Sequence, residues 1–151
     1  MNVRFASYFA LTKPCVVILL QITGICSVLA HDLLESGGLS ENTARTISIV
    51  LIGGYLTAGG ANSINMWYDR DIDPLMSRTA NRPIPAGEIS PSSALIFGIL
   101  ISILGTWWLY VMANPVAAFW VAFSVLFYVF VYSMCCLLYT SDAADDSLRV
   151  D

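Results

Sequence analysis

Charged residues are scarce in this sequence. They make up 12% of the 151 residues, whereas soluble domains average about 25%. Hydrophobic residues account for 57%, and the mean hydropathy is +0.71. This composition excludes an ordinary soluble domain and predicts a membrane protein. The few lysines and arginines form no basic patch, so we expect the lipid bilayer as a partner and no nucleic acid.

Side chains typical of zinc, haem or disulfide chemistry are equally few. The four cysteines include no CxxC pair and lie in apolar runs, so packing is their favoured role. His31 is the only histidine, and it falls in a polar connection predicted over residues 31–45. We favour a solvated histidine there over a haem ligand.

Four apolar segments are long enough to cross a membrane. Residues 15–30, extended upstream by Ala10 and Leu11, approach the roughly 20 residues that a spanning helix needs. Further spans are predicted over 46–68, 92–113 and 116–139, and prolines suit the first turn of three spans: Pro14, Pro91 and Pro115. The predicted fold class is therefore all-α, a polytopic transmembrane helical bundle of four spans, whose last two helices are antiparallel neighbours.

The second predicted span is rich in small residues, namely Gly53, Gly54, Gly59, Gly60 and Ala61. Such residues let neighbouring helices approach closely. They equally leave room for a ligand beside the helix, and the sequence does not decide between these two uses.

A concentration of polar residues follows this span directly. Asn65, Asp69 and Asp73 stand four residues apart, which places them on one face of a helix that continues to Asp73. Mg²⁺ prefers oxygen ligands, and it commonly takes only one or two carboxylates while substrate phosphates complete its shell. The pattern predicts a metal–diphosphate site. A solvated loop is the alternative, but the neighbouring Met66 and Trp67 indicate interfacial depth, where ionisable groups suggest function.

The positive residues are unevenly divided between the two sides of the predicted spans. Arg45 lies on one side, and five residues lie on the other: Arg4, Lys13, Arg70, Arg78 and Arg82. Cytoplasmic loops carry an excess of positive charge. We therefore expect a multi-pass protein of the inner (plasma) membrane with its aspartate-rich loop and active site facing the cytoplasm.

The string NMWYDRDIDPLMSRTANRPIPAGEISP (65–91), with Leu11-Thr-Lys-Pro14, resembles the UbiA superfamily of intramembrane prenyltransferases, and within it the branch that farnesylates protohaem IX. The short Asn65-x3-Asp69-x3-Asp73 pattern is common to the superfamily, whereas the longer string is specific to the branch. The resemblance covers residues 6–134. By analogy of fold, it implies about nine transmembrane helices around a central cavity that opens to the cytoplasm.

The resemblance also implies a reaction. Farnesyl is transferred from farnesyl diphosphate to a vinyl group of haem b, which gives haem O. The implied catalytic residues, which hold Mg²⁺ on the diphosphate, are Asn65, Asp69 and Asp73. The implied diphosphate-binding residues are Arg78 and Arg82, and Lys13 either adds charge to the same pocket or only anchors its helix.

The residue types themselves are consistent with this chemistry. Ionisation of an allylic diphosphate leaves negative charge on the departing group, which a divalent ion and arginines stabilise in a water-poor site. Aromatic side chains can stabilise the allylic cation. Membrane anchoring is nevertheless their more common role, and we favour it for Trp67, Tyr68, Trp107 and Trp108.

Two departures from the family pattern bear on activity. Cys15 stands where the branch usually has an arginine, and the second aspartate-rich motif of the family is absent from the sequence. The acidic residues at 140–151 do not replace that motif. We therefore expect residues 1–139 to be the N-terminal part of a UbiA-type domain, residues 140–151 to be a foreign or artefactual tail, and the chain to be inactive alone.

Two other functions are alternatives. One is a UbiA-type enzyme that prenylates an aromatic ring such as 4-hydroxybenzoate, because such enzymes share the short motif. The other is a non-enzymatic membrane protein that binds or conducts cations through Asp69 and Asp73. The second is disfavoured because the acids lie at the ends of spans or in loops and not deep inside a span.

Overall fold

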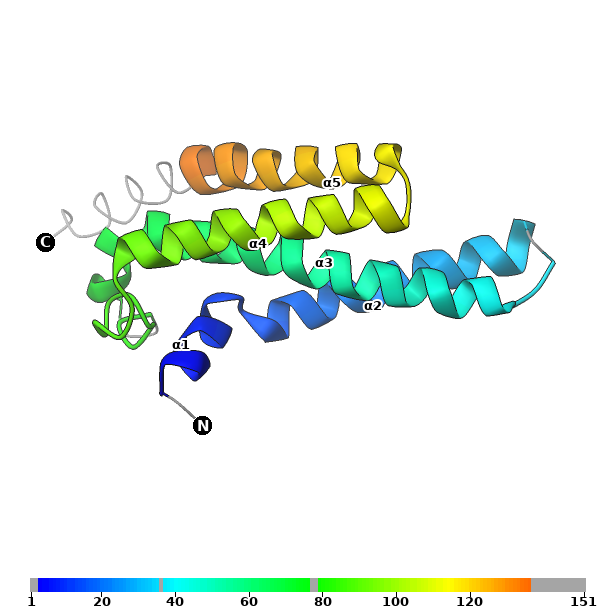
Figure 1. Cartoon of the computed structure of the whole chain (residues 1–151). Helices are drawn as coiled ribbons and strands as arrows, with labels where there is room; N and C mark the ends of the chain where they lie inside the picture. The colour runs from blue at the N-terminus through cyan, green and yellow to red at the C-terminus, as the bar shows by residue number, and fades with distance from the viewer. Residues whose placement is uncertain (1–2, 36, 77–78, 137–151) are drawn as a thin grey trace, which may run out of the picture.

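The computed structural model of the chain describes residues 3–35, 37–76 and 79–136, so the predicted tail at 140–151 lies outside it. The elements follow one another as α1 (Val3–Leu11), α2 (Pro14–Glu35), α3 (Glu41–Tyr68), two short 3-10 turns η1 (Asp69–Asp71) and η2 (Asp73–Leu75), α4 (Pro91–Met112), α5 (Pro115–Phe127) and the π-helical η3 (Tyr128–Cys136). Helices α2 to α5 run along one common direction, and α1 leads into α2 near one end of the bundle (Figure 1).

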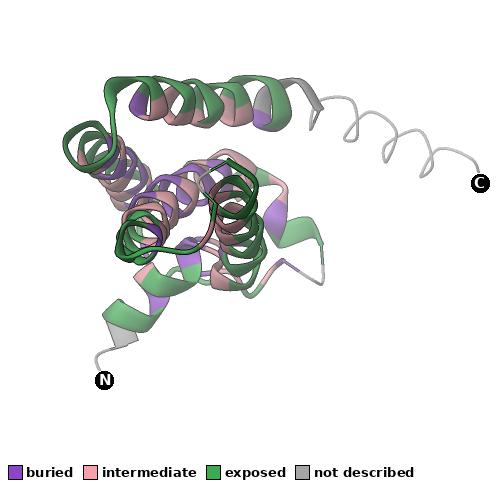
Figure 2. Ribbon diagram, turned by 90° about the vertical axis from the view of Figure 1, so that its right-hand side faces the viewer, coloured by how far each residue is buried: buried purple, intermediate pink, exposed green. Residues whose placement is uncertain are grey.

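Four helical segments of this bundle are long and apolar enough to cross a membrane: Pro14–Glu35, Glu41–Asp71, Pro91–Met112 and Pro115–Ser133. Burial concentrates between the helices, and many large apolar side chains are exposed on their outer faces (Figure 2). An apolar outer surface suits lipid tails, which are as apolar as leucine. The predicted all-α bundle with four spans is confirmed.

Helices α4 and α5 begin where the sequence predicts them to begin. The Ser90 hydroxyl accepts a hydrogen bond from the Ser93 N–H at 3.3 Å, and Asn114 Oδ1 accepts one from the Ala117 N–H at 2.7 Å. Both side chains satisfy N–H groups that have no partner within the helix. The connection between α4 and α5 is therefore short, and the two helices are antiparallel neighbours, as predicted (Figure 1).

The first predicted span begins later than expected. Ala10 and Leu11 belong to α1, because the helical structure is interrupted at Thr12 and Lys13 before α2 begins. Lys13 has a φ of 50°, which lies outside the helical region. The two upstream residues therefore do not extend the span.

The connection between the first two spans is also shorter than predicted. Helix α2 continues to Glu35, so His31 lies in a helix and not in a loop. The His31 ring lies 3.1 Å from an Asp32 oxygen and 3.7 Å from a Glu35 oxygen. Thr43 at the start of α3 donates a hydrogen bond to the Asp32 carboxylate. These polar contacts stabilise helical structure beyond the apolar run.

Helix α3 packs closely against α4 through small residues. A methyl group at Gly60 would lie 2.6 Å from the Gly98 carbonyl oxygen and 2.9 Å from the Ser102 nitrogen. A methyl group at Gly105 would lie 2.9 Å from the Thr57 nitrogen. Two helix backbones approach this closely only where no side chain separates them. The glycines at this interface therefore serve helix packing.

A small apolar core lies at the end of the bundle where α1, α3, the segment before α4, and α4 itself meet. Its buried members are Leu11, Met66, Ile84, Ile89 and Ala94. Burial of such side chains stabilises by about 25 cal/mol per Å² of apolar surface removed from water. This core fixes the segment after η2 against the end of α3, where the polar residues of the site lie.

The close approach of α3 and α4 predicts a large effect of Gly60→Ala. The added methyl group meets backbone atoms that have no rotamer to change, so we expect a loss of about 1–3 kcal/mol in the free energy of unfolding. Gly24→Ala is the matched control, because its methyl group would meet only the Val50 side chain, at 3.2 Å. Denaturation in detergent micelles, followed by far-ultraviolet circular dichroism, measures both variants. Equal stability of the two would contradict the packing described above.

Candidate functional site

The three predicted metal ligands do not lie on one continuous α-helix. Helix α3 ends at Tyr68, and the chain continues through η1 and η2, where the Ile72 N–H bonds to the Asp69 carbonyl at 2.9 Å. The predicted continuation of the helix to Asp73 is therefore wrong. Pro74 has no N–H with which to continue the α-helical hydrogen bonds.

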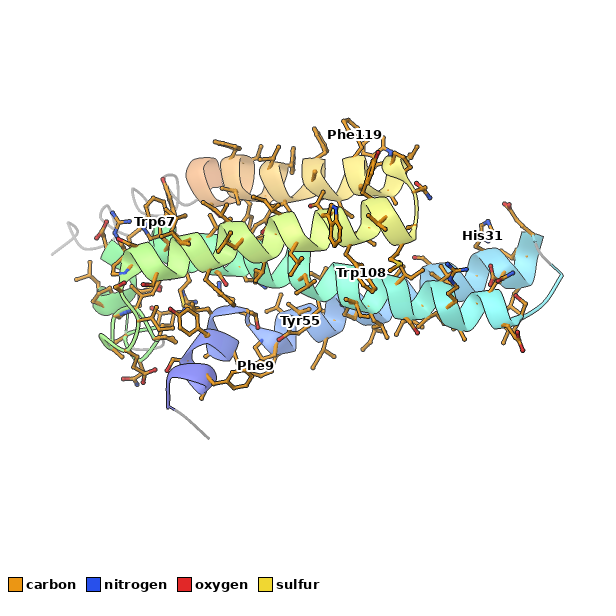
Figure 3. The ribbon with its side chains drawn as sticks, viewed as in Figure 1. Phe9, His31, Tyr55, Trp67, Trp108 and Phe119 are labelled. Atoms are coloured by element: carbon orange, nitrogen blue, oxygen red, sulfur yellow. The ribbon has the colours of Figure 1, made fainter. Side chains whose placement is uncertain are left out.

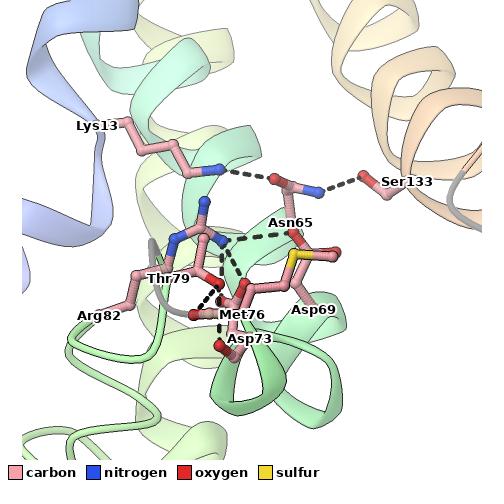
Figure 4. A network of polar contacts seen from close by, with 8 residues as sticks. All are labelled: Lys13, Asn65, Asp69, Asp73, Met76, Thr79, Arg82 and Ser133. Carbon is pink, nitrogen blue, oxygen red and sulfur yellow. Dashed lines mark hydrogen bonds and ion pairs between the residues drawn. The ribbon is translucent and has the colours of Figure 1, made fainter. Parts of the chain in front are cut away.

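The Arg82 guanidinium brings the two aspartates together (Figure 4). Its Nη1 donates to both carboxylate oxygens of Asp73, at 2.7 and 2.8 Å, and lies 3.7 Å from Asp69 Oδ2. The side chains of Asp73 and Asp69 are only 5% and 13% exposed. Thr79 Oγ1 donates to the Asp73 carbonyl oxygen at 2.9 Å and ties the following segment to η2. The second predicted arginine, Arg78, lies outside the described residues.

Asn65, one helical turn before Asp69, is held from two sides (Figure 4). Lys13 Nζ donates to Asn65 Oδ1 at 2.8 Å, and Asn65 Nδ2 donates to Ser133 Oγ at 3.1 Å. Lys13 comes from the break between α1 and α2, and Ser133 comes from η3. We refer to the charged and amide side chains that meet here as the polar cluster: Lys13, Asn65, Asp69, Asp73 and Arg82.

One buried oxygen of the polar cluster has no partner within the described part of the chain. Asp69 Oδ1 is inaccessible to solvent and accepts no hydrogen bond. Buried polar atoms in proteins are almost always paired, so an exception of this kind requires an explanation. A divalent metal ion provides one, because Mg²⁺ binds carboxylate oxygens. The chemistry of this atom therefore fits a metal ligand.

The polar cluster does not supply a full set of metal ligands by itself. Among the described residues there is no group of three His, Cys, Asp or Glu side chains that could hold a metal ion. A metal ion at Asp69 and Asp73 would therefore take further ligands from phosphate oxygens, from water or from other protein groups. Mg²⁺ commonly binds in this way.

Asp71 and the aromatic residues stay outside the polar cluster. The Asp71 side chain is 80% exposed and lies 3.6 Å from Arg70, and Arg70 in turn lies over the Trp67 ring, 4.7 Å from its centroid. Trp108 lies nearer the other end of the bundle, where its Nε1 donates to the Ile49 carbonyl at 3.1 Å (Figure 3). Trp67 and Trp108 thus each have a structural contact.

An apolar cavity of about 460 Å³ lies within the bundle, and no member of the polar cluster lines it. It lies between α2, α3 and α5, with Asn62 and Tyr128 in its lining. The small α3 residues Gly54, Ala58 and Ala61 also line it. Some small residues of α3 therefore pack against α4 and others leave space beside the helix, and the use of this space by a ligand stays a prediction.

Comparison with known proteins assigns the chain to a family. The sequence profile of the UbiA prenyltransferase family matches residues 23–141. The chain belongs to this family. Curated relatives named protoheme IX farnesyltransferase include those of Gluconacetobacter diazotrophicus (43% identical, covering 84% of this chain and 38% of the relative), Symbiobacterium thermophilum (42%, covering 84% and 40%) and Streptomyces avermitilis (42%, covering 87% and 41%). The chain spans about two fifths of the length of these relatives. No solved structure matches it.

Three residues around this UbiA-family site were not predicted from the sequence: Asn62, Thr79 and Ser133. Asn62 stands three positions before Asn65, and this spacing on one helical face was a readable signal. Ser133 gave no such signal. Its contact with Asn65 depends on the π-helical register of η3, and π-helices are rare and follow no simple sequence pattern.

The pairing in the polar cluster predicts that Arg82→Met destabilises the UbiA fold by about 3 kcal/mol, because the buried Asp73 carboxylate loses its cation. Arg70→Met is the matched control, since its acidic partner Asp71 is exposed, and its loss should stay below about 1 kcal/mol. Denaturation midpoints in detergent micelles compare the two variants. A smaller effect at Arg82 than at Arg70 would show that the Asp73 pair does not stabilise this end of the bundle.

Proposed function

We propose that this chain forms the part of a prenyltransferase that binds the diphosphate of farnesyl diphosphate, and that the enzyme transfers farnesyl to a vinyl group of haem b to give haem O. The observation that carries the proposal is the buried Asp69 oxygen, which has no partner among the described residues and lies beside Asp73 and Arg82 at the end of a membrane helix. The names of the curated relatives support both substrates. We assign this part of the domain to residues 1–139, as the sequence predicts.

Asp69 and Asp73 are the proposed ligands of Mg²⁺, and Asn65 stands one helical turn before Asp69. When bound, the metal ion neutralises negative charge on the diphosphate. Asp69 is the better placed ligand, because one of its oxygens has no partner in the described part of the chain, whereas both oxygens of Asp73 accept hydrogen bonds from Arg82.

Arg82 is the proposed residue that joins the carboxylates to the diphosphate. Within the described residues, Nη1 makes the hydrogen bonds and ion pairs of the Arg82 guanidinium. A guanidinium has five N–H donors, so its Nε and Nη2 groups are available for phosphate oxygens. Lys13 adds a second positive charge at Asn65. As the bond to the farnesyl group breaks, these two cations stabilise the charge that develops on the departing diphosphate.

The apolar cavity between α2, α3 and α5 suits the hydrocarbon part of the donor. Its lining is predominantly apolar, and it reaches Asn62, one turn before Asn65. A farnesyl chain placed there would leave its diphosphate at the polar cluster. The apolar walls would also keep water away from the allylic carbon, which limits hydrolysis.

The two alternative functions have less support. An aromatic ring acceptor is disfavoured because the curated relatives given above are named for protoheme IX. A cation-conducting protein is disfavoured because Asp69 and Asp73 lie at the end of α3, beyond Tyr68, and are paired with Arg82.

We also propose that the polar cluster faces the cytoplasm, because Lys13, Arg70 and Arg82 lie at its end of the bundle and Arg45 lies near the other end. In a cysteine-free variant, Asn81→Cys should resist a membrane-impermeant maleimide in intact cells and react after permeabilisation. Asn42→Cys, which is exposed at the opposite end, should react from outside. The reverse pattern would overturn the orientation.

The reaction itself is tested in membranes that contain the chain together with the C-terminal segment of the Gluconacetobacter diazotrophicus relative beyond the matched region. With Mg²⁺, haem b and farnesyl diphosphate, we expect haem O from this combination and none from the chain alone. Asp69→Asn should lower transfer by about 10²–10³-fold, the typical effect of removing one stabilising group.

Asp71→Asn is the matched control for Asp69→Asn, because it removes the same charge two residues away on an exposed side chain. It should leave transfer within about threefold of the parent, as expected for a surface substitution. Equal losses in the two variants, or no haem O from any combination, would contradict the proposed function.

A further inference from the structure

The break between α1 and α2 has an unusual backbone. Lys13 has a φ of 50°, a left-handed conformation that is unfavourable for a residue with a Cβ atom. The Lys13 carbonyl nevertheless accepts the first hydrogen bonds of α2, from Val16 at 3.0 Å and Val17 at 3.2 Å. Strained conformations of this kind persist only where surrounding contacts enforce them, and they occur often at functional sites.

Three residues on one side of α3 surround Thr12, immediately before this turn. Asn62 Nδ2 donates to the Thr12 carbonyl at 3.0 Å, and both residues are buried. The Tyr55 hydroxyl lies 3.0 Å from Thr12 Oγ1. Because Thr12 donates its own hydroxyl hydrogen to the Phe9 carbonyl at 2.7 Å, Tyr55 is the donor in this pair. Gly59 completes the surround, since a methyl group there would lie 3.0 Å from Thr12 Cβ.

Helix α3 contacts both the backbone of this turn and the side chain of Lys13. Lys13 Nζ donates to Asn65 Oδ1 at 2.8 Å, one turn along α3 from Asn62 (Figure 4). Asn62 thus fixes the backbone before Lys13, and Asn65 fixes the ammonium group at its end. A flexible lysine side chain loses much conformational entropy when it is held in one place. Because the backbone at Thr12 is already fixed, the Lys13 side chain has fewer conformations to lose when its ammonium group binds Asn65.

We infer that Asn62 is a positioning residue: it holds the left-handed turn at Thr12–Lys13 and thereby keeps the Lys13 ammonium at the polar cluster. This inference deepens the proposed function, on which its purpose rests, because the positioned charge is the one that would face the diphosphate. Tyr55 assists Asn62 through the Thr12 hydroxyl. Neither residue is expected to touch the substrate diphosphate, so both act through Lys13.

The sequence offers a direct measurement of this positioning, because Lys13 is its only lysine. An amine-reactive, water-soluble acetylating reagent, applied to the purified chain in nanodiscs, labels Lys13, and mass spectrometry gives the rate relative to the N-terminal amine of the same chain. In the parent chain the hydrogen bond to Asn65 should slow this reaction. Asn62→Ala should raise the rate about two- to tenfold, the range that corresponds to the loss of one buried hydrogen bond.

Two further variants separate positioning from general stability. Tyr55→Phe removes only the hydroxyl and keeps the ring that stacks on Phe9 at 6.5 Å between centroids (Figure 3), so it should raise the rate in the same direction by a smaller factor. Asn42→Ala is the matched control, since it removes an exposed asparagine amide at the opposite end of α3, and it should leave the rate unchanged.

Unchanged labelling in both Asn62→Ala and Tyr55→Phe would overturn the inference. So would faster labelling accompanied by faster hydrogen exchange throughout α4, because Asn62 would then only stabilise the fold. The measurement needs neither metal nor prenyl donor. A failure of positioning therefore appears in the labelling rates, whereas a failure of the proposed function appears in the transfer assay.

Discussion

The pairing of Arg82 with Asp73 is the interaction on which the rest of this end of the molecule depends. Two carboxylates lie almost buried beside a membrane helix, where an uncompensated charge is strongly unfavourable. Arg82 compensates them from a segment that the small core around Met66 and Ile84 holds in place. Lys13 and Ser133 then hold Asn65 from two other directions. One oxygen of Asp69 is left without a partner among the described residues, and we propose that a metal ion binds there.

Helix α3 is central to these contacts because each of its faces contacts a different part of the molecule. One face carries Gly60 and approaches the α4 backbone within van der Waals distance. A second borders the apolar cavity through Gly54 and Ala61. A third holds Thr12 through Asn62. Small residues serve the first two faces for opposite reasons, since they permit contact with a backbone in one place and leave space in another.

Sequence patterns predicted the spans and the polar residues of the site, but they did not predict how the residues meet. Proline and N-cap signals located α4 and α5, because such signals act locally. The four-residue spacing placed Asn65, Asp69 and Asp73 on one helical face, which is wrong for the last two, since Asp69 and Asp73 follow the α-helix in 3-10 turns and are joined by Arg82. The break at Lys13 and the register of Ser133 depend on tertiary contacts and on irregular backbone, which local patterns do not encode.

We propose above all that Asp69 and Asp73 bind a divalent metal ion together with a diphosphate. Electron paramagnetic resonance of Mn²⁺, which prefers the same oxygen ligands as Mg²⁺, tests it directly on the chain in nanodiscs titrated with inorganic pyrophosphate. We expect bound Mn²⁺ whose affinity rises with pyrophosphate, and loss of this signal in Asp69→Asn but not in Asp71→Asn. Identical Mn²⁺ binding by the parent chain and by Asp69→Asn would contradict it.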